Sequence, residues 1–200
     1  MIDFYTSATW NGKRAAIMLE ETGLEYQVHK IDLAQGEQKK ASYLEINPSG
    51  RIPAIVDNEE GEGLIVTQSA AILLYLAEKS GKFLPQETAA RAKVMEWLFF
   101  HATDISPTMF DSFFLSKRCD PVQPAAAQFL NQRIFELYKN FDVQLADNEF
   151  IAGADYSIAD IAIFPTINDL TLLESYPNLK RWHTLVSQRA AVQKGMSIPA

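Results

Sequence analysis

Hydrophobic and polar positions in the first eighty residues follow two alternating spacings, which predict strands and helices in turn. Short β-prone or alternating runs predict strands at residues 2–6, 25–33, 54–57 and 64–66. Apolar residues at helical spacing predict helices over 13–22 and 68–79, with a short charged helix within 35–46. The predicted order for this half of the chain is therefore β-α-β-α-β-β-α.

From residue 89 onward the spacing is helical, and no convincing strand appears. Helices are expected over 89–100, 125–146 and 178–189, with a bend or interruption at Ser106-Pro107. Ser157 and Asp160 have the spacing of a helix capping box, so we expect them to be structural. Gly and Pro punctuate residues 81–87, which predicts a linker between a domain at 1–80 and an all-helical domain at 88–200.

Composition narrows the class of protein. The 200 residues are 48% hydrophobic, enough for a sizeable core, and the net charge of −7 argues against a general nucleic-acid binder. There is no apolar run of membrane-spanning length and no signal-peptide pattern, so a cytoplasmic protein without membrane contact is expected. Cys119 is the only cysteine, which rules out a Cys-x-x-Cys pair. The three histidines show no ligand spacing, and we expect no metal.

Two neighbouring elements have the chemistry to hold a ligand. Arg51-Ile52-Pro53 places a proline directly before a strand, where a tight turn with a cis bond would leave neighbouring backbone unpaired. Gln68 and Ser69 stand at a helix N-terminus, where free amide N–H groups and the helix dipole favour an anion. An extended, carboxylate-bearing ligand is expected to lie between these elements.

Four segments, taken in order, resemble the glutathione transferase superfamily along the whole chain. They are NPSGRIPAIVD (47–57), TQSAAILLYLAEK (67–79), YSIADIAIFP (156–165) and YPNLKRWHTLV (176–186). The resemblance implies a thioredoxin-like βαβαββα domain followed by an all-helical C-terminal domain. The early segments most resemble the bacterial Nu-type, disulfide-bond oxidoreductase-like branch: Thr9, Asn11, Gly12 and Gln38 match, and Trp10 replaces that branch's proline.

The resemblance also implies glutathione as co-substrate and assigns residues to it. Ser69 and Gln68 are expected to hold the γ-glutamyl carboxylate and amine, and the backbone of Ile52 to pair with the cysteinyl residue. Gln38 and Arg51 are expected to bind the glycine carboxylate, with Lys39 and Lys40 nearby. Pro53 is expected to be structural, because it exposes the backbone beside it.

The glutathione thiol must ionise to react, and the Nu-type resemblance favours Asn11, with Thr9, as the donors that stabilise the thiolate. Tyr5 is a rival donor, since other branches use a tyrosine near the end of this strand. Plainer interpretations stay open at this point. Asn11 and Gly12 can be a turn and a helix start only, and Gln68-Ser69 a helix cap only.

The leading hypothesis is a glutathione transferase-like enzyme whose bound thiolate attacks a disulfide, a peroxide or an electrophilic carbon. The Nu-type resemblance favours disulfide reduction, and without a Cys-x-x-Cys pair the electrons must come from glutathione. The alternatives are a non-catalytic glutathione-binding regulatory module and a glutathione-dependent isomerase or ether-cleaving enzyme. The resemblance implies a homodimer, and six aromatic residues are expected in the core or the dimer surface: Trp97, Phe99, Phe100, Phe110, Phe113 and Phe114.

Overall fold

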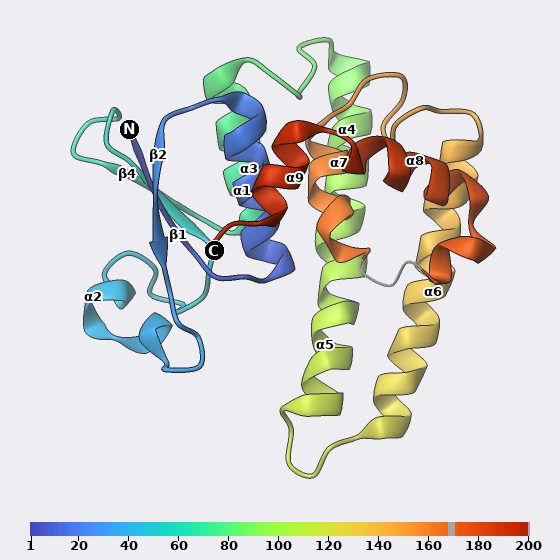
Figure 1. Ribbon diagram of the computed structural model, residues 1–200, viewed down its shortest axis with the longest axis horizontal. Coiled ribbons are helices and arrows are strands. Elements are labelled where there is room, and N and C mark those ends of the chain that lie inside the picture. Colours follow the sequence, from blue (N-terminus) through green and yellow to red (C-terminus); the bar gives the residue numbers. More distant parts are fainter. Residues whose placement is uncertain (168–170, 200) are drawn as a thin grey trace. The chain divides into compact units, whose positions relative to one another are not determined.

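The computed structural model describes residues 1–167 and 171–199, and its contacts divide the chain into two compact units (Figure 1). The first unit is Met1–Leu84 together with the segment that starts at Val186, and the second is Pro85–Leu185. The ranges predicted above as domains, 1–80 and 88–200 with a linker at 81–87, stay a prediction about independent folding.

A four-stranded sheet forms the centre of the first unit, in the order β2-β1-β3-β4. β1 is parallel to β2 and antiparallel to β3, and β3 is antiparallel to β4. All four predicted strands are confirmed, the second as a shorter element than 25–33. Their bounds are β1 Ile2–Thr6, β2 Tyr26–Lys30, β3 Ala54–Asp57 and β4 Leu64–Thr67.

Helices lie on both faces of this sheet. α1 and α3 cover one face, and α2 lies at the other, where Tyr43 of α2 contacts the ring of Tyr5 (Figure 1). The charged helix expected within 35–46 forms as a 3₁₀ turn, η1, followed by one turn of α2. The bounds are α1 Trp10–Thr22, η1 Glu37–Lys39, α2 Ala41–Leu44 and α3 Ser69–Ser80.

The chain returns to the first unit at its C-terminal end through α9, Ala190–Met196, a helix that the sequence pattern did not predict. α9 packs so closely on α1 that a Cβ atom at Gly195 would lie 2.6 Å from the backbone nitrogen of Ile17. The Arg189 Nε atom lies 2.6 Å from Glu21 Oε1 of α1, and Lys194 Nζ lies 2.9 Å from Glu20 Oε2. Close backbone contact and two ion pairs therefore join α9 to α1.

A polar network joins the sheet to α3. The Asp57 side chain is buried, and its Oδ2 atom accepts hydrogen bonds from Tyr75 at 2.6 Å and from Lys79 at 2.8 Å. Burial alone raises the Asp57 pKa, but these bonds outweigh it, and the net effect lowers that pKa. The same surroundings raise the pKa of Tyr75 to about 12, first through burial and then through its bond to Asp57.

The second unit is helical, as predicted, and no strand occurs within its described residues, 85–167 and 171–185. Between α4 and α5 the chain forms a π-helix, η2, and Pro107 enters the first turn of α5, where its missing N–H is not needed. The expected interruption at Ser106-Pro107 is thus a local change of helix type. The bounds are α4 Thr88–Phe100, η2 His101–Ile105, α5 Ser106–Lys117 and α6 Pro124–Ala146.

The rest of this unit is organised around Asp160, which is fully buried. Its Oδ2 atom accepts from Ser157 N at 2.9 Å and from Ser157 Oγ at 3.1 Å, and both bonds of the capping box form, as predicted. Its Oδ1 atom accepts from Ile151 N at 2.9 Å and Trp182 Nε1 at 2.7 Å. The remaining helices are α7 Ile158–Ile163, η3 Phe164–Thr166, η4 Leu172–Ser175 and α8 Pro177–Ser187.

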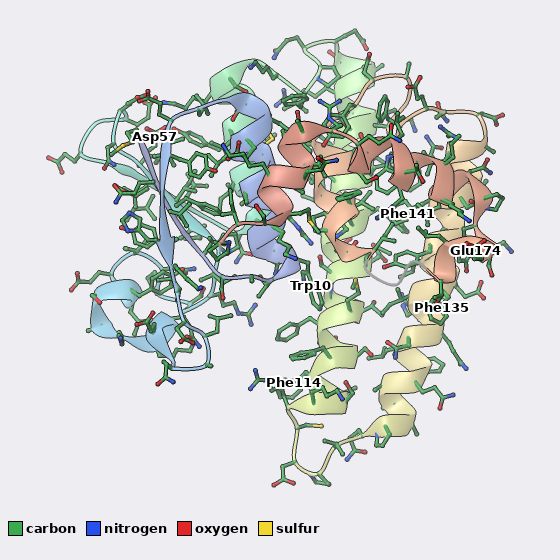
Figure 2. The ribbon with its side chains drawn as sticks, in the orientation of Figure 1. Trp10, Asp57, Phe114, Phe135, Phe141 and Glu174 are labelled. Carbon is green, nitrogen blue, oxygen red and sulfur yellow. The ribbon has the colours of Figure 1, made fainter. Side chains whose placement is uncertain are left out.

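Aromatic side chains divide between the interior and the surface of the second unit. Trp97 and Phe100 pack on Phe141, with ring centroids 5.6 and 5.5 Å from it, whereas Phe114 projects from α5 (Figure 2). Four phenylalanines on α4 and α5 are exposed: Phe99, Phe110, Phe113 and Phe114. No helix within residues 1–167 and 171–199 has the length and apolar character needed to cross a bilayer.

Candidate functional site

The strand register brings the predicted site residues together at one edge of the sheet, namely the edge at which β1 and β4 end and β3 begins. Thr6 pairs with Lys30, Tyr5 with Ala54, and Ala54 with Thr67. The connections from β1 to α1, into β3, and from β4 to α3 therefore all leave or enter the sheet at this edge. These three connections carry the residues predicted to hold the ligand, so the fold brings together segments that are up to sixty residues apart.

The connection from β1 ends in a helix cap made by Thr9. This residue has extended backbone, and its Oγ1 atom accepts a hydrogen bond from Gly12 N at 3.2 Å. The cap explains why α1 begins at Trp10, three residues before the predicted start at 13. The hydroxyl proton of Thr9 is not used by any hydrogen bond within the described residues, so Thr9 can cap the helix and still donate to a ligand.

Asn11 is the second residue of α1. It follows Trp10, which Figure 2 labels at the N-terminal end of that helix. Within residues 1–167 and 171–199 its half-buried amide group makes no hydrogen bond, so it has donors available. The N–H groups of the first helical turn and the helix dipole add positive potential at the same place. An anion such as a thiolate would be stabilised there.

Gly12 has a steric role in this turn. A Cβ atom at this position would lie 2.3 Å from the carbonyl oxygen of Ser7 and 2.4 Å from Thr6 Oγ1. Any side chain would push the connection away from α1. The Asn-Gly pair therefore belongs to a helix start that packs on its own loop.

The connection into β3 contains the Ile52-Pro53 bond, which is cis as the turn chemistry suggested. The carbonyl oxygen of Arg51 accepts from Tyr43 Oη at 2.7 Å and from Asn47 Nδ2 at 2.6 Å. These contacts hold the turn, and within the described residues the backbone N–H and carbonyl of Ile52 make no hydrogen bond. An extended ligand can therefore pair with Ile52 as a short strand would.

The turn at η1 lies against this connection. Gly50 has a φ of 59°, and a Cβ atom there would lie 2.8 Å from the carbonyl oxygen of Gln38. Lys39 Nζ donates to the carbonyl of Ser49 at 3.3 Å. The Oε1 atom of Gln38 is buried without a hydrogen-bond partner in the described chain, which is costly unless a ligand supplies a donor.

The cationic side chains expected near the glycine carboxylate differ in their surroundings. Lys40 forms an ion pair with Glu37 at 2.8 Å, so its charge is largely neutralised within the turn. Arg51 is exposed beside the cis-proline turn. A carboxylate here therefore receives less positive potential from Lys40 than from Lys39, whose amino group contacts a neutral carbonyl.

The connection from β4 to α3 places Gln68 and Ser69 at the helix start. Gln68 has φ 70° and ψ 118°, a backbone conformation that residues with a side chain rarely adopt and that occurs often at ligand sites. Its side chain makes no capping hydrogen bond to α3. Ser69 is the first residue of the helix, and its Oγ atom lies 3.4 Å from Arg14 Nη1 of α1.

Tyr5, the rival thiol donor, has neighbours on the α2 side of the sheet. Its ring stacks on His29 with centroids 4.6 Å apart, and it meets Tyr43 edge-on. Its neighbours in β1, Phe4 and Thr6, are both buried. Burial raises the pKa of Tyr5, so its hydroxyl stays protonated at neutral pH. A protonated phenol can still donate, so the choice between Tyr5 and the pair Thr9 and Asn11 as thiol donor stays a prediction.

Three residues of the site were missed by sequence reasoning. Tyr43 and Asn47 hold the cis-proline turn, and Arg14 contacts Ser69 from another helix. A buried Asn six residues before the proline that precedes a strand carries no signal by itself, because its partner is a backbone carbonyl. No cluster of three or more His, Cys, Asp or Glu residues suited to a metal occurs in the described ranges.

Two protein-family models match most of the chain. The model described as glutathione S-transferase, N-terminal domain, matches residues 2–78, and the model described as glutathione S-transferase, C-terminal domain, matches residues 104–194. Among curated proteins, disulfide-bond oxidoreductase YfcG of Escherichia coli (strain K12) is 36% identical over 203 residues, which are 98% of this chain and 94% of that protein.

Solved structures extend the likeness to three dimensions. A glutathione transferase from Burkholderia graminis, with two glutathione molecules bound per subunit, has a TM-score of 0.92 at 32% identity and covers 99% of this chain and 88% of its own. A glutathione transferase from Pseudomonas putida, with one glutathione disulfide bound per subunit, has a TM-score of 0.90 at 31% identity, with coverages of 100% and 92%.

Proposed function

Because this chain belongs to the glutathione S-transferase family, we propose that it binds glutathione at the sheet edge described above and uses the thiolate to reduce disulfides. The γ-glutamyl group lies at Gln68 and Ser69, the cysteinyl backbone pairs with Ile52 beside Pro53, and Gln38 and Arg51 hold the glycine carboxylate. The observation that carries this proposal is the gathering of these segments at one edge, with an unpaired backbone at Ile52.

Ionisation of the thiol is the chemical demand on the site. A cysteine thiol has a pKa of about 8.5, so only about 3% is thiolate at neutral pH. Lowering that pKa to about 6.5 makes roughly three-quarters of the thiol reactive and requires about 2.7 kcal/mol of preferential stabilisation. Asn11, the Thr9 hydroxyl and the N-terminus of α1 supply donors for this purpose.

The reaction needs two molecules of glutathione and no cysteine from the protein. The first thiolate attacks one sulfur of the substrate disulfide, the S–S bond breaks, and the departing thiolate takes a proton. The second glutathione thiolate then attacks the mixed disulfide, which releases glutathione disulfide and the second reduced thiol. The binding of two glutathiones or of glutathione disulfide by the solved relatives, and the name of the Escherichia coli relative, support this assignment.

The proposal is tested with purified protein, glutathione, and three substrates: a small aliphatic disulfide, a chromogenic aryl halide and a hydroperoxide. Disulfide turnover is expected to exceed the other two. Asn11→Ala should lower kcat/KM for the disulfide about tenfold to hundredfold and move its pH profile toward higher pH, because the thiolate loses a donor. Asn140→Ala, an exposed asparagine of α6, is the matched control.

Binding separates this function from its rivals. Retention on immobilised glutathione that Ser69→Ala abolishes, without turnover of any of the three substrates, would indicate a non-catalytic binding module instead. Failure to bind glutathione at all would refute the site.

We also infer a homodimer in the cytoplasm. Four exposed aromatic residues lie on α4 and α5, and we call them the apolar stripe: Phe99, Phe110, Phe113 and Phe114. Phe110 and Phe114 stack on each other, and the Arg118 guanidinium lies 5.8 Å from the Phe113 ring. A second copy of the chain is the occupant this stripe fits, since apolar patches of this kind mark interfaces. A reducing compartment supplies the glutathione that the reaction consumes.

A further inference from the structure

Arg14 is a buried arginine in the first unit, and its position calls for an explanation. Its side chain is 2% exposed, and it lies among the buried apolar residues of α1 although it carries a charge. Burial of a guanidinium costs free energy unless its donors find partners, and burial lowers the Arg14 pKa to about 9. Even so, the group stays charged at neutral pH.

The contact with Ser69 determines the role that this serine can play. Arg14 Nη1 donates to Ser69 Oγ at 3.4 Å, and α1 and α3 pack against each other along this line. A guanidinium has five donors and no acceptor, so the serine oxygen must be the acceptor in this contact. The Ser69 hydroxyl proton therefore points elsewhere, and within the described residues it has no other partner.

Charge acts in the same direction as geometry. The N-terminus of α3 already presents free N–H groups to an anion, and Arg14 adds a buried positive charge next to the first residue of that helix. A charge in a water-poor interior is screened less than a surface charge. A carboxylate at Ser69 would therefore receive a hydroxyl proton and a favourable field together.

We propose that Arg14 is a positioning residue, which orients the Ser69 hydroxyl as a donor to the γ-glutamyl carboxylate of glutathione. This inference rests on the proposed glutathione site. Arg14 acts through Ser69 and does not itself touch the ligand. Its effect is confined to binding of that one carboxylate. Arg14 therefore raises the affinity for glutathione and leaves the rate of the chemical step at saturation unchanged.

The test compares two ligands by titration calorimetry. One is glutathione, and the other is its analogue without the γ-glutamyl α-carboxylate, γ-aminobutyryl-cysteinyl-glycine. Arg14→Met keeps the aliphatic stem and removes the charge and the donors. It should weaken glutathione binding about tenfold and change analogue binding less than about twofold. KM for glutathione should rise to match, with kcat changed less than about twofold.

Two further variants complete the comparison: a conservative replacement of Arg14 and a control at another arginine. Arg14→Lys keeps the charge but not the planar fork, so glutathione binding should weaken only about threefold, again without a comparable loss for the analogue. This variant carries the test if Arg14→Met does not fold. Arg189→Met removes another arginine that contacts α1, at Glu21, and should not separate the two ligands.

The outcomes divide cleanly. Equal weakening of both ligands in the Arg14 variants, or a loss in kcat at unchanged KM, would show a merely structural role and overturn the inference. Unchanged glutathione binding in Arg14→Met would overturn it as well, while the proposed function stands. Absence of glutathione binding by the unaltered protein would overturn both.

Discussion

Trp10 is the residue at which this chain departs from the Thr-Pro-Asn-Gly pattern of the Nu-type branch. It occupies the first position of α1, next to Asn11, and its indole is half-buried. Within residues 1–167 and 171–199 the ring makes no aromatic contact or hydrogen bond. An aromatic wall beside Asn11 and Thr9, the proposed thiolate donors, would favour co-substrates with aromatic rings.

Trp10→Pro tests this point without disturbing the helix. Proline is well tolerated at the first helical position, so the free energy of unfolding should change by less than about 1 kcal/mol. Turnover of an aromatic disulfide should fall about fivefold relative to an aliphatic one, because ring stacking contributes about 1 kcal/mol. Steady-state kinetics with both substrates provide the measurement, and Trp10→Phe should retain the preference.

Single residues were predictable where the chemistry is local. The capping box of Ser157 with Asp160 depends on partners within three positions, and it was predicted. The cap at Thr9 is equally local, but the predicted helix start at 13 did not include it. Arg14 and Asn47 were not predictable, because their partners depend on tertiary structure. The contact between Arg14 and Ser69 joins residues 55 positions apart. From the sequence alone, a charged residue within an apolar helix pattern is assigned to the surface.

Asp57 joins two elements, β3 and α3, and its pKa makes that connection dependent on pH. Its folded-state pKa lies below the ordinary value, so its stabilising effect is present above the unfolded pKa, about 3.9, and is lost as pH falls through the folded pKa. Asp57→Asn should therefore lower the free energy of unfolding by about 2 kcal/mol at neutral pH.

The difference between Asp57→Asn and the unaltered protein should shrink as pH falls below about 4. Urea unfolding at a series of pH values measures it. Glu62→Gln, an exposed residue of the connection between β3 and β4, should unfold like the unaltered protein. A difference that does not vary with pH would show that the ion pair with Lys79 is not its source.

Asp160 connects the loop before α7 with α8, and its two oxygens accept four hydrogen bonds. Asp160→Asn places an NH₂ group against two donors, whichever way the amide turns. We expect a loss of about 3 kcal/mol in unfolding free energy, because those donors stay buried without acceptors. Chemical denaturation measures the loss, with the exposed Asp155→Asn as the control; an equal stability of both variants would contradict the assignment.

The type of each helix and strand was predicted better than its first and last residues. The strand expected over 25–33 is shorter because its partner β1 ends at Thr6, which pairs with Lys30. The short helix α9 was missed because its apolar pattern continues that of α8. The region around Ser106-Pro107 was expected to interrupt a helix. It contains a π-helix, whose extra residue per turn leaves no distinct trace in the hydrophobic spacing.

At the scale of the whole molecule, the sequence predicted the fold class and the enzyme class correctly. The family models and the solved relatives confirm a glutathione transferase-like enzyme with a thioredoxin-like part and a helical part. Four ordered motifs were sufficient for that assignment. The co-substrate could not be predicted in the same way, because its contacts depend on side chains that no short motif contains.

The proposed homodimer is testable through the apolar stripe on α4 and α5. Replacing Phe110 and Phe113 by Glu would bury two charges in the interface, so the double variant should run as a monomer in sedimentation velocity. Val143→Glu, at an exposed apolar residue of α6 outside the stripe, should leave the assembly unchanged. A monomeric unaltered protein, or a dimeric double variant, would refute this interface.

The packing of α9 on α1 has a consequence for the order in which the protein is made. Ribosomes release the chain from its N-terminus, so β1 to α3 leave the exit tunnel long before residues 190–196 have been joined. Until then α1 lacks the neighbour that Gly195 brings into backbone contact with Ile17. The first unit to be synthesised is therefore the last to be completed, and during translation the surface of α1 around Ile17 stays without the helix that later covers it.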